Sequence, residues 1–546
     1  MDDVLEKAFL SELEALEKFR ISYSGQHPNA PLAREDPDVR RLIEAMAMFS
    51  ARTRLASQRN LGKSLLRIFR QHFPFFTNPV PAMALLRAKP TRRYVDMTSI
   101  PSGTEVQLSR VNDEGREEIY RFQTLARLDV RPIELEAVDI YRLRNRNYRL
   151  LLRFVTAFPR SDDIGSLKLL VNHFDDLFSS STVYYQLKSH LRQATVVYSD
   201  KVTEEMTGSP LEAIFDVARG EPYDIELFEH PLQRARALLR FPEQALFLEL
   251  RGVHPPRNWR VFTVCLDMDA SWPTELRLTP DAFELHAVPM VNIRKDTANP
   301  IECDGTKDRY PVLHPEPSSG FAVHSIIGVY RMTPEGLSPL PPVVVGTGGE
   351  GYDVAFQGRG RDQMTWLSLS LRNAFVQPER IVVEGRWYQP SIAGARGDEM
   401  RARLSDRFVD GVEWSCMGSI TAPAENALAD DRDALLQLLA IKSQRFLGLP
   451  ELTLLLKALG ADKERLSGRL ISALTSVKVI PKPFSRKSSG FKYLYELGFE
   501  RLDETLLPSL DLLGRRLLEV LTAWSVEEVV EVVAEVASLG LTLRYS

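Results

Sequence analysis

The sequence predicts a multidomain α+β protein, with a helical N-terminal bundle, a β-rich middle and a mixed, partly helical C-terminal region. Three observations predict this class. Apolar residues near both ends recur at spacings of three and four, which is typical of amphipathic helices. Between the ends the period falls towards two, and prolines and glycines separate short runs, which is typical of strands. The length of 546 residues is enough for about three or four domains.

Changes in this pattern predict four regions. They are a helical N-terminal region over 1–80, a mixed α/β domain over 81–240, a β-rich domain over 241–420 and a C-terminal α/β domain over 421–546 that ends in two helices. We find no internal repeat of 20 to 50 residues, which disfavours a solenoid or a propeller.

The sequence pattern of the N-terminal region predicts three helical runs. Asp3 and Glu6 have the spacing of a capping box. Asp36 before Pro37 is typical of a helix start, and a third run over 61–73 ends before a proline. The second run carries one apolar stripe, formed by Val39, Leu42, Ile43, Met46 and Phe49. An adjoining hairpin covers only part of such a stripe, so we expect it to contact a partner protein or, as an equal alternative, the protein's own β-rich domain.

The middle of the chain predicts mostly strands. Representative runs are 105–108, 120–123, 259–266, 321–330 and 364–371. Helices are predicted within this part at 163–170 and 231–239.

The C-terminal region predicts helices at 431–440, 452–459, 508–522 and 526–539. Ser525 and Glu528 have capping-box spacing at the start of the last helix. Its apolar face includes Val529 and Val533. Valine is a mediocre helix former, so this helix would depend on packing for its stability. The face either closes the core of the domain, which we favour, or contacts another protein.

Residue patterns that carry chemistry are largely missing. The three cysteines, Cys265, Cys303 and Cys416, form no CxxC pair, and the nine histidines form no zinc spacing. Residues 346–351 fit GxGxxG, but a dinucleotide site needs a helix after the glycines, and here a loop and a strand are predicted. We therefore predict no catalytic residue, no cofactor and no metal, although a glycosidase-like carboxylate pair is not excluded by sequence.

Charge and hydropathy restrict the partners and the location. The net charge is −4, whereas proteins that bind nucleic acid usually carry a basic surplus. Met1 is followed by two aspartates, where a signal peptide would carry Lys or Arg. The longest apolar runs, such as 245–250, are far shorter than the ~20 residues that span a bilayer. We expect a cytoplasmic protein that neither binds nucleic acid nor inserts into a membrane.

The order of short strings along the chain resembles the TssF (VasA/ImpG) family, a baseplate subunit of the bacterial type VI secretion system. The N-terminal strings are 9–16 (FLSELEAL), 36–44 (DPDVRRLIE), 48–52 (MFSAR) and 79–83 (PVPAM). Further strings are 103–106 (GTEV), 122–124 (FQT), 241–243 (FPE), 285–292 (LHAVPMVN), 434–439 (ALLQLL) and 471–477 (ISALTSV). The segments 385–390 and 524–525 depart from the family pattern, which is typical of a divergent branch.

The resemblance implies a structural role like that of wedge proteins in contractile phage baseplates. Such a subunit is expected to assemble as two copies with TssG, to contact TssK and TssE, and to help nucleate the contractile sheath in a membrane-docked baseplate. In that setting the apolar stripe from Val39 to Phe49 would contact TssG, and Val529 with Val533 would join neighbouring wedges into a ring. Two alternatives remain: a wedge protein of another contractile machine, such as a phage tail, and a β-rich hydrolase.

Overall fold

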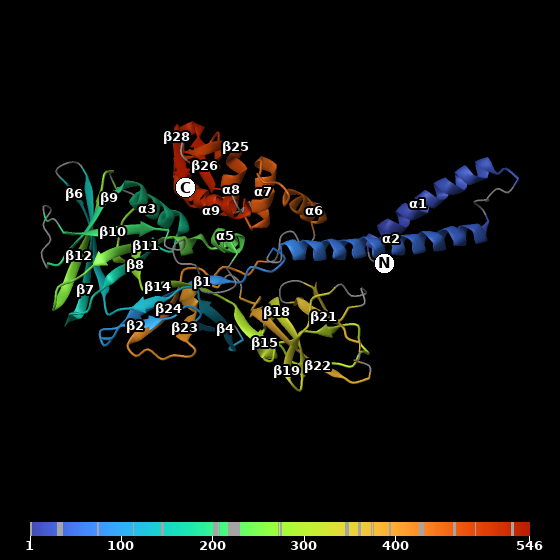
Figure 1. Cartoon of the computed structure of the whole chain (residues 1–546), viewed down its shortest axis with the longest axis horizontal. Helices are drawn as coiled ribbons and strands as arrows, with labels where there is room; N and C mark the ends of the chain where they lie inside the picture. Colours follow the sequence, from blue (N-terminus) through green and yellow to red (C-terminus); the bar gives the residue numbers. More distant parts are fainter. Residues whose placement is uncertain are drawn as a thin grey trace. The chain divides into compact units, whose positions relative to one another are not determined.

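The computed structural model describes the chain apart from a set of short segments. These are residues 1–2, 30–35, 74–75, 113, 144–146, 200–205, 207, 217–229, 271, 274–275, 344–348, 359–361, 373, 375, 393–394, 425–430, 462–465, 486–487 and 526–528. The chain divides into two compact units, coloured by sequence in Figure 1. The helical unit comprises Met1–Thr77 and Leu428–Gln444, and the β-rich unit comprises Asn78–Ala427 and Arg445–Ser546.

The helical unit contains α1 (Asp3–Gln26), α2 (Pro37–His72) and α6 (Arg432–Ile441). Helix α2 begins as predicted, because the Asp36 side chain accepts a hydrogen bond from the Asp38 N–H at 2.9 Å and Pro37 occupies the first turn. The prediction of two separate runs was wrong, since α2 is continuous over 36 residues. Residues 51–60 between the runs contain no proline and are rich in Ala, Arg, Leu and Gln, which favour helix.

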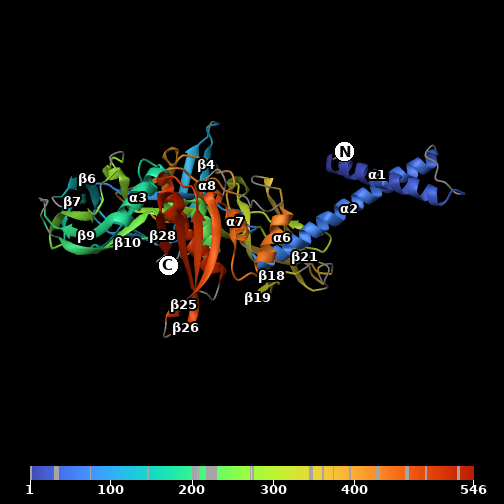
Figure 2. The same cartoon turned by 90° about the horizontal axis from the view of Figure 1, so that it is seen from above.

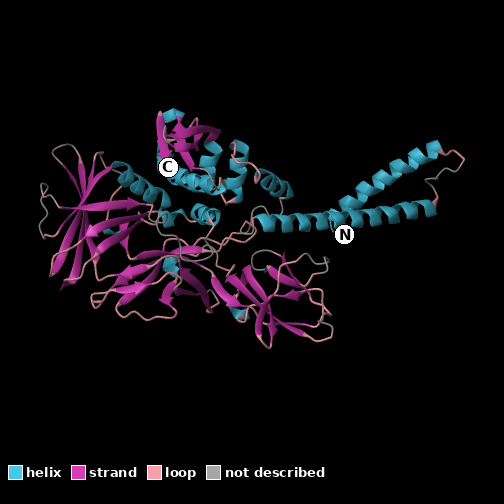
Figure 3. Ribbon diagram, in the orientation of Figure 1, coloured by secondary structure: helices cyan, strands magenta, loops and turns pink. Residues whose placement is uncertain are grey.

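A closed barrel forms one part of the β-rich unit, as Figure 3 shows in magenta. Its strands follow the order β1 (Met83–Pro90), β14 (Ala287–Val291), β4 (Glu117–Thr124), β3 (Glu105–Val111), β23 (Arg401–Leu404) and β24 (Val412–Met417). Alternate side chains such as Val106 and Leu108 point into the apolar core of the barrel. A strand pair β2 (Thr98–Ile100) and β5 (Leu128–Val130) lies apart from the barrel ladder.

An eight-stranded sheet forms a second part of this unit. Its order is β13 (Phe283–Leu285), β8 (Gly165–Val171), β11 (Phe247–Val253), β10 (Ser209–Phe215), β9 (Leu191–Val197), β12 (Trp259–Met268), β7 (Tyr148–Arg160) and β6 (Glu134–Arg142). The sheet takes strands from both sides of residue 240, so the domain boundary predicted there does not coincide with a boundary between sheets. The helix predicted at 163–170 was wrong, because β8 pairs with a strand on each side and its apolar side chains are buried there.

Two smaller sheets and their helices complete the middle of the chain. One sheet contains β15 (Arg294–Thr297), β22 (Glu379–Tyr388), β18 (Ala322–Thr333), β19 (Gly336–Pro339) and β16 (Ile301–Cys303). The other contains β17 (Tyr310–Pro311), β21 (Met364–Ser370) and β20 (Gly351–Gln357). Helices α3 (Leu177–His190) and α5 (Pro231–Arg240) contact the C-terminal helix α9 (Leu507–Trp524). The helix predicted at 231–239 is thereby confirmed.

The C-terminal part contains helices α7 (Leu449–Ala458) and α8 (Leu466–Ala473) and a four-stranded sheet. The order of the sheet is β25 (Leu474–Ser485), β26 (Ser488–Phe499), β27 (Val529–Val536) and β28 (Leu541–Tyr545). Strands β26 and β27 run parallel, and α9 makes the crossover between them. The helices predicted at 431–440, 452–459 and 508–522 are confirmed by α6, α7 and α9.

The last predicted helix, 526–539, was wrong. Its first three residues lie outside the described part of the chain, and Val529–Val536 is a strand. The spacing of Glu531 and Glu535 fits a helix, but β-branched valine packs better on a pleated surface, and alternate residues from Val530 to Val536 form a buried face of the strand. The α+β class itself is confirmed by helices at the start, strands in the middle and mixed elements at the end (Figure 3).

Candidate partner interface

The hairpin of α1 and α2 is the first candidate interface, and the two helices lie side by side in Figures 1 and 2. Ala47 and Ala51 of α2 are fully buried. Their small side chains allow the neighbouring helix to approach closely. The Arg54 guanidinium of α2 pairs with the Glu12 carboxylate of α1 at 2.9 Å. These contacts define one face of α2 as the side that is covered within the unit.

The predicted apolar stripe of α2 divides between a covered and an uncovered side. Val39 and Ile43 are half-buried. Leu42, Met46 and Phe49 are 62%, 50% and 74% exposed. Residues at i, i+4 and i+7 lie on one face of a helix, so these three form a continuous apolar surface, which we call the hairpin face. The structure thus brings all five predicted residues onto α2 and leaves three of them accessible.

Sequence reasoning missed several further exposed apolar side chains of the hairpin. They are Val4, Leu10, Phe19 and Ile21 on α1, and Leu61 and Ile68 on α2. The available signal was the presence of apolar residues on more than one face of each helix, since a helix that is apolar on more than one face is usually covered on more than one face. Scattered exposed apolar residues are normal, but a group of them on one hairpin makes this surface a candidate interface.

The C-terminal end of α2 is better covered than the hairpin face. Helix α6 packs against α2, and its N-cap residue Asp431 accepts a hydrogen bond from the Ala434 N–H at 3.0 Å. Phe69, Phe73 and Phe76 form an aromatic cluster with ring centroids 5.3 to 6.2 Å apart. The Lys442 ammonium lies 5.5 Å from the centroid of the Phe73 ring. The exposed apolar surface is therefore concentrated away from this anchored end.

The two C-terminal candidates lie on strand β27 instead of a helix. Val529 is 47% exposed, whereas Val533 is only 8% exposed. Their register partners on β26 are Lys492 and Glu496. The Lys492 ammonium pairs with the Glu531 carboxylate at 2.7 Å on the same side of the sheet. This side is charged, unlike the hairpin face.

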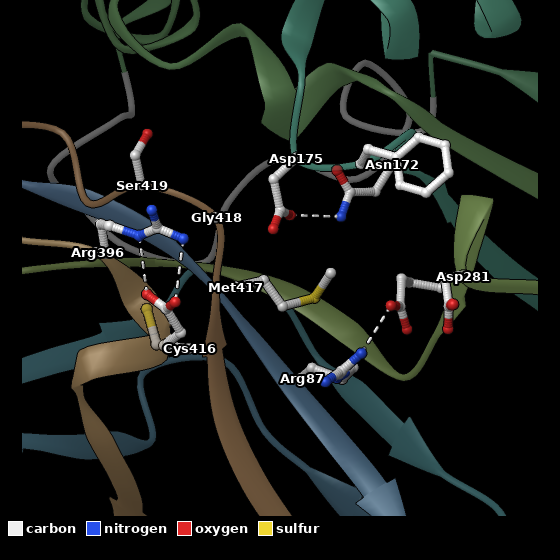
Figure 4. Close-up of a pocket in the computed structure, with 12 residues that line it drawn as sticks. Arg87, Asn172, Asp175, Asp281, Arg396, Cys416, Met417, Gly418 and Ser419 are labelled. Carbon is white, nitrogen blue, oxygen red and sulfur yellow. Dashed lines mark hydrogen bonds and ion pairs between the residues drawn. The ribbon is translucent and has the colours of Figure 1, made fainter. Parts of the chain in front are cut away.

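A charged pocket of about 600 Å³ lies in the β-rich unit (Figure 4). The Arg87 guanidinium pairs with the Glu284 carboxylate at 2.7 Å, and Arg396 makes two bonds of 3.1 Å to Asp398. Burial raises the pKa of Glu284, although Arg87 opposes this shift. The Asn172 side-chain amide donates to the Asp175 carboxylate at 2.8 Å. The pocket therefore contains carboxylates held by arginines and an amide.

The cysteine thiols of this unit are poorly suited to nucleophilic attack. Cys416 lines the charged pocket, and burial raises the pKa of its thiol to about 12. Burial also raises the pKa of the Cys265 thiol. Because the thiolate is the nucleophile, both groups are protonated near neutral pH.

The remaining sequence motifs give no cofactor site within the described residues. No group of three or more His, Cys, Asp or Glu side chains there is placed to hold a metal ion. The first half of the glycine-rich string 346–351 lies outside the described residues, and Gly351 begins strand β20 where a dinucleotide site would need a helix. None of the described helices is long and apolar enough to cross a bilayer.

Known structures share this fold. A chain of the TssK–TssF–TssG baseplate subcomplex of the type VI secretion system, solved by cryo-electron microscopy, superposes with a TM-score of 0.76 at 17% identity, over 93% of this chain and 98% of that one. A chain of a type VI secretion baseplate complex gives 0.61 at 16% identity, over 99% and 98%. No curated protein matches the sequence.

The sequence itself matches a family model over most of its length. The model describes TssF of the type VI secretion system and covers residues 1–362 of the 546. This span includes the hairpin face, the eight-stranded sheet and most of the barrel. The resemblance found in the sequence strings is thereby confirmed, and the chain belongs to the TssF family of the type VI secretion system.

Proposed function

We propose that the chain is a structural wedge component of a type VI secretion baseplate and that it assembles with TssG through the hairpin face. The family match and the shared fold support the baseplate role. The observation that carries the proposed contact is the exposure of Leu42, Met46 and Phe49 on a hairpin that is covered on its other side. Covering these side chains on association would remove apolar surface from water, which is the main driving force of most protein–protein interfaces.

The further partners follow from the family. TssK and TssG stand beside TssF in the names of the related complex. We extend the proposal to TssE, to a second copy of this chain, and to a role in nucleating the contractile sheath. The corresponding location is the cytoplasmic side of a membrane-docked assembly. Of the two C-terminal candidates for a ring contact, Val529 is the accessible one, because Val533 is buried.

The proposal does not include catalysis. In the charged pocket the acidic side chains Glu284 and Asp398 pair with arginines, and the Cys416 thiol is protonated at neutral pH. A hydrolase would instead need a nucleophile or a carboxylate pair whose pKa values are set for proton transfer. A wedge protein needs only surfaces that fit its neighbours.

Co-purification tests the proposed contact. Full-length chain would be co-expressed with tagged TssG, as wild type and as the triple variant Leu42→Gln, Met46→Gln, Phe49→Gln. The matched control is Arg40→Gln, Arg41→Gln, Arg52→Gln, which introduces the same residue type at exposed positions of α2 off the stripe. Glutamine is a good helix former, so both variants keep α2 intact.

We expect the hairpin-face variant to lose TssG and the control variant to retain it. Circular dichroism and the melting temperature would verify that both variants fold like the wild type. Equal recovery of TssG with both variants would contradict the proposed contact.

A further inference from the structure

A polar pocket of about 590 Å³ lies on the outer surface of the barrel and shares no lining residue with the charged pocket of Figure 4. It is lined by Glu105, Gln107, Arg121, Arg294, Glu316, Arg403, Leu404, Ser405 and Asp406. The neighbours of Gln107 on β3, Val106 and Leu108, point into the barrel core, so Gln107 points outward. We propose that this pocket binds an acidic side chain of a partner protein, in a segment where basic residues flank the acid.

The floor of the pocket is a row of three residues on adjacent strands. Gln107 of β3 lies directly opposite Arg121 of β4 and directly opposite Arg403 of β23. Register partners of an antiparallel pair project to the same face of the sheet. The row therefore gathers two guanidinium groups and one amide from three separate parts of the chain.

Gln107 supplies a hydrogen-bond donor that the described structure leaves unused. Its side chain is only 4% exposed. Arg403 Nη2 donates to Gln107 Oε1 at 2.9 Å, and this bond fixes which end of the amide is the oxygen. The other end, Nε2, is buried and has no partner among the described residues. A buried donor without an acceptor is costly, so an incoming oxygen at this point would be favoured.

Of the three arginines that line the pocket, one has no carboxylate partner among the described residues. The Glu105 carboxylate lies 2.6 Å from Arg121 and 3.8 Å from Arg294, and the Asp296 carboxylate lies 3.3 Å from Arg294. These pairs balance both arginines. Arg403 has no carboxylate partner among the described residues, and its side chain is exposed and able to turn towards a ligand. An acceptor that carries negative charge fits Arg403 and the Gln107 amide together.

The rim of the pocket has the opposite charge. Glu316 and Asp406 line it with exposed carboxylates. They would repel a polyanion such as a nucleic acid or a phosphate-rich surface. They would attract Lys or Arg beside the acid that enters the pocket. This division of charge is the reason for choosing a protein segment of mixed charge as the occupant.

Ligand-observed saturation-transfer NMR on the purified full-length chain tests the proposal without TssG or any other baseplate protein. The probes are the blocked tripeptides Lys-Glu-Lys and Lys-Gln-Lys, which differ only by the central charge. The variants are Gln107→Leu, which removes the unpaired donor, and Arg403→Met, which changes an exposed residue. The matched control is Arg401→Met, because Arg401 is exposed on the same strand and does not line the pocket.

We expect the wild type to bind Lys-Glu-Lys at least about tenfold more tightly than Lys-Gln-Lys, since the second peptide lacks the charge-assisted bonds. Gln107→Leu and Arg403→Met should each lose most of this preference, and Arg401→Met should keep it. Melting temperatures close to that of the wild type would establish that the variants fold. Failure of the wild type to bind, equal binding of both peptides, or an undiminished preference in both pocket variants would each overturn the proposal.

Discussion

Two phenylalanines illustrate how differently the two units of this chain treat apolar surface. Phe262 of the β-rich unit is fully buried and stacks on Phe154 with ring centroids 4.9 Å apart. Phe49 of the helical unit projects from a two-helix hairpin, and three-quarters of its surface is exposed. The β-rich unit buries large apolar clusters within its own sheets, although single side chains such as Phe408 and Val376 are exposed, whereas Leu42, Met46 and Phe49 lie exposed together on one helix face. In the function proposed above, the apolar clusters provide stability and the hairpin face provides assembly.

The elements themselves explain this division. A strand of the β-rich unit gains its hydrogen bonds from neighbouring strands, so it forms only beside a strand that pairs with it. A helix makes its hydrogen bonds within itself, and α2, with 36 residues, is long enough to persist with one face uncovered. A long helical hairpin can therefore keep an exposed apolar face without a neighbouring element to pair with it.

Substitutions at the two phenylalanines should give the largest difference in the free energy of unfolding between the two units. Phe262→Ala is expected to lower the free energy of unfolding by about 3–5 kcal/mol, because it removes buried surface and leaves a cavity. Phe49→Ala should change it by about 0.5 kcal/mol or less. Urea unfolding of both variants, followed by far-ultraviolet circular dichroism, which reports on the helices of the hairpin as well as on the β-rich unit, measures the difference. Similar losses would show that the hairpin is as fully packed as the core.

Strand β27 allows the same comparison between a buried valine and an exposed valine. Val533→Asp should cost about 3 kcal/mol or more, because it places a charge at a buried position. Val529→Asp should cost about 1 kcal/mol or less, because that position is exposed and lies opposite Lys492. Thermal unfolding of the two variants checks the assignment of a strand. A helix with both valines on one buried face would make the two losses equal.

Acid should weaken the β-rich unit through a buried histidine. Burial lowers the pKa of His286 to about 3, and its Nε2 accepts a hydrogen bond from the Arg131 N–H at 3.2 Å, so the folded protein holds this ring neutral. The unfolded chain protonates it below a pKa of about 6.5. Stability is therefore complete above that value and falls as the pH decreases towards 3.

Between pH 6.5 and 5 this histidine should account for about 2 kcal/mol of the loss. Urea titrations of the wild type and of His286→Asn across this range measure the slope. Asparagine tolerates the positive φ of 53° at this position. The variant should show a flatter dependence on pH, and an unchanged slope would contradict the assignment.

The start of α2 should show the smallest effect. Asp36→Ala removes the cap that accepts from the Asp38 N–H, which is expected to cost the first turn about 1 kcal/mol. Hydrogen exchange of amides in residues 38–42 would measure the loss, with Asp36→Asn as the control that keeps a capping oxygen. Exchange as slow in the alanine variant as in the wild type would show that other contacts hold this turn.

Local signals predicted the helices α5, α6, α7 and α9 but did not show which of the remaining segments pair in sheets. Asp36 and Pro37 identified the start of α2, because a cap and a fixed φ act within a few residues of each other. The strand β8 was misassigned because only its neighbours in the eight-stranded sheet, distant in sequence, make it a strand. Strand β27 was likewise misassigned along its whole length, because the spacing of its charged residues also fits a helix.

Of the two candidate sites, one could be predicted from the sequence and the other could not. The hairpin face follows from helical periodicity, so its residues could be named from the sequence. The polar pocket of the barrel depends on the contact between Gln107 and Arg403, which are 296 positions apart. Register between distant strands sets this contact, and no spacing in the sequence reveals it.

Oxidation of methionine provides the most direct test of the claim that a partner covers the hairpin face. Met46 of α2 and Met332 of the β-rich unit have nearly equal exposure, so hydrogen peroxide should oxidise them at similar rates in the isolated chain. After addition of TssG, mass spectrometry of tryptic peptides should show Met46 oxidised at least about tenfold more slowly, with Met332 as the internal reference. An unchanged rate at Met46 in a sample in which TssG is bound would contradict the account.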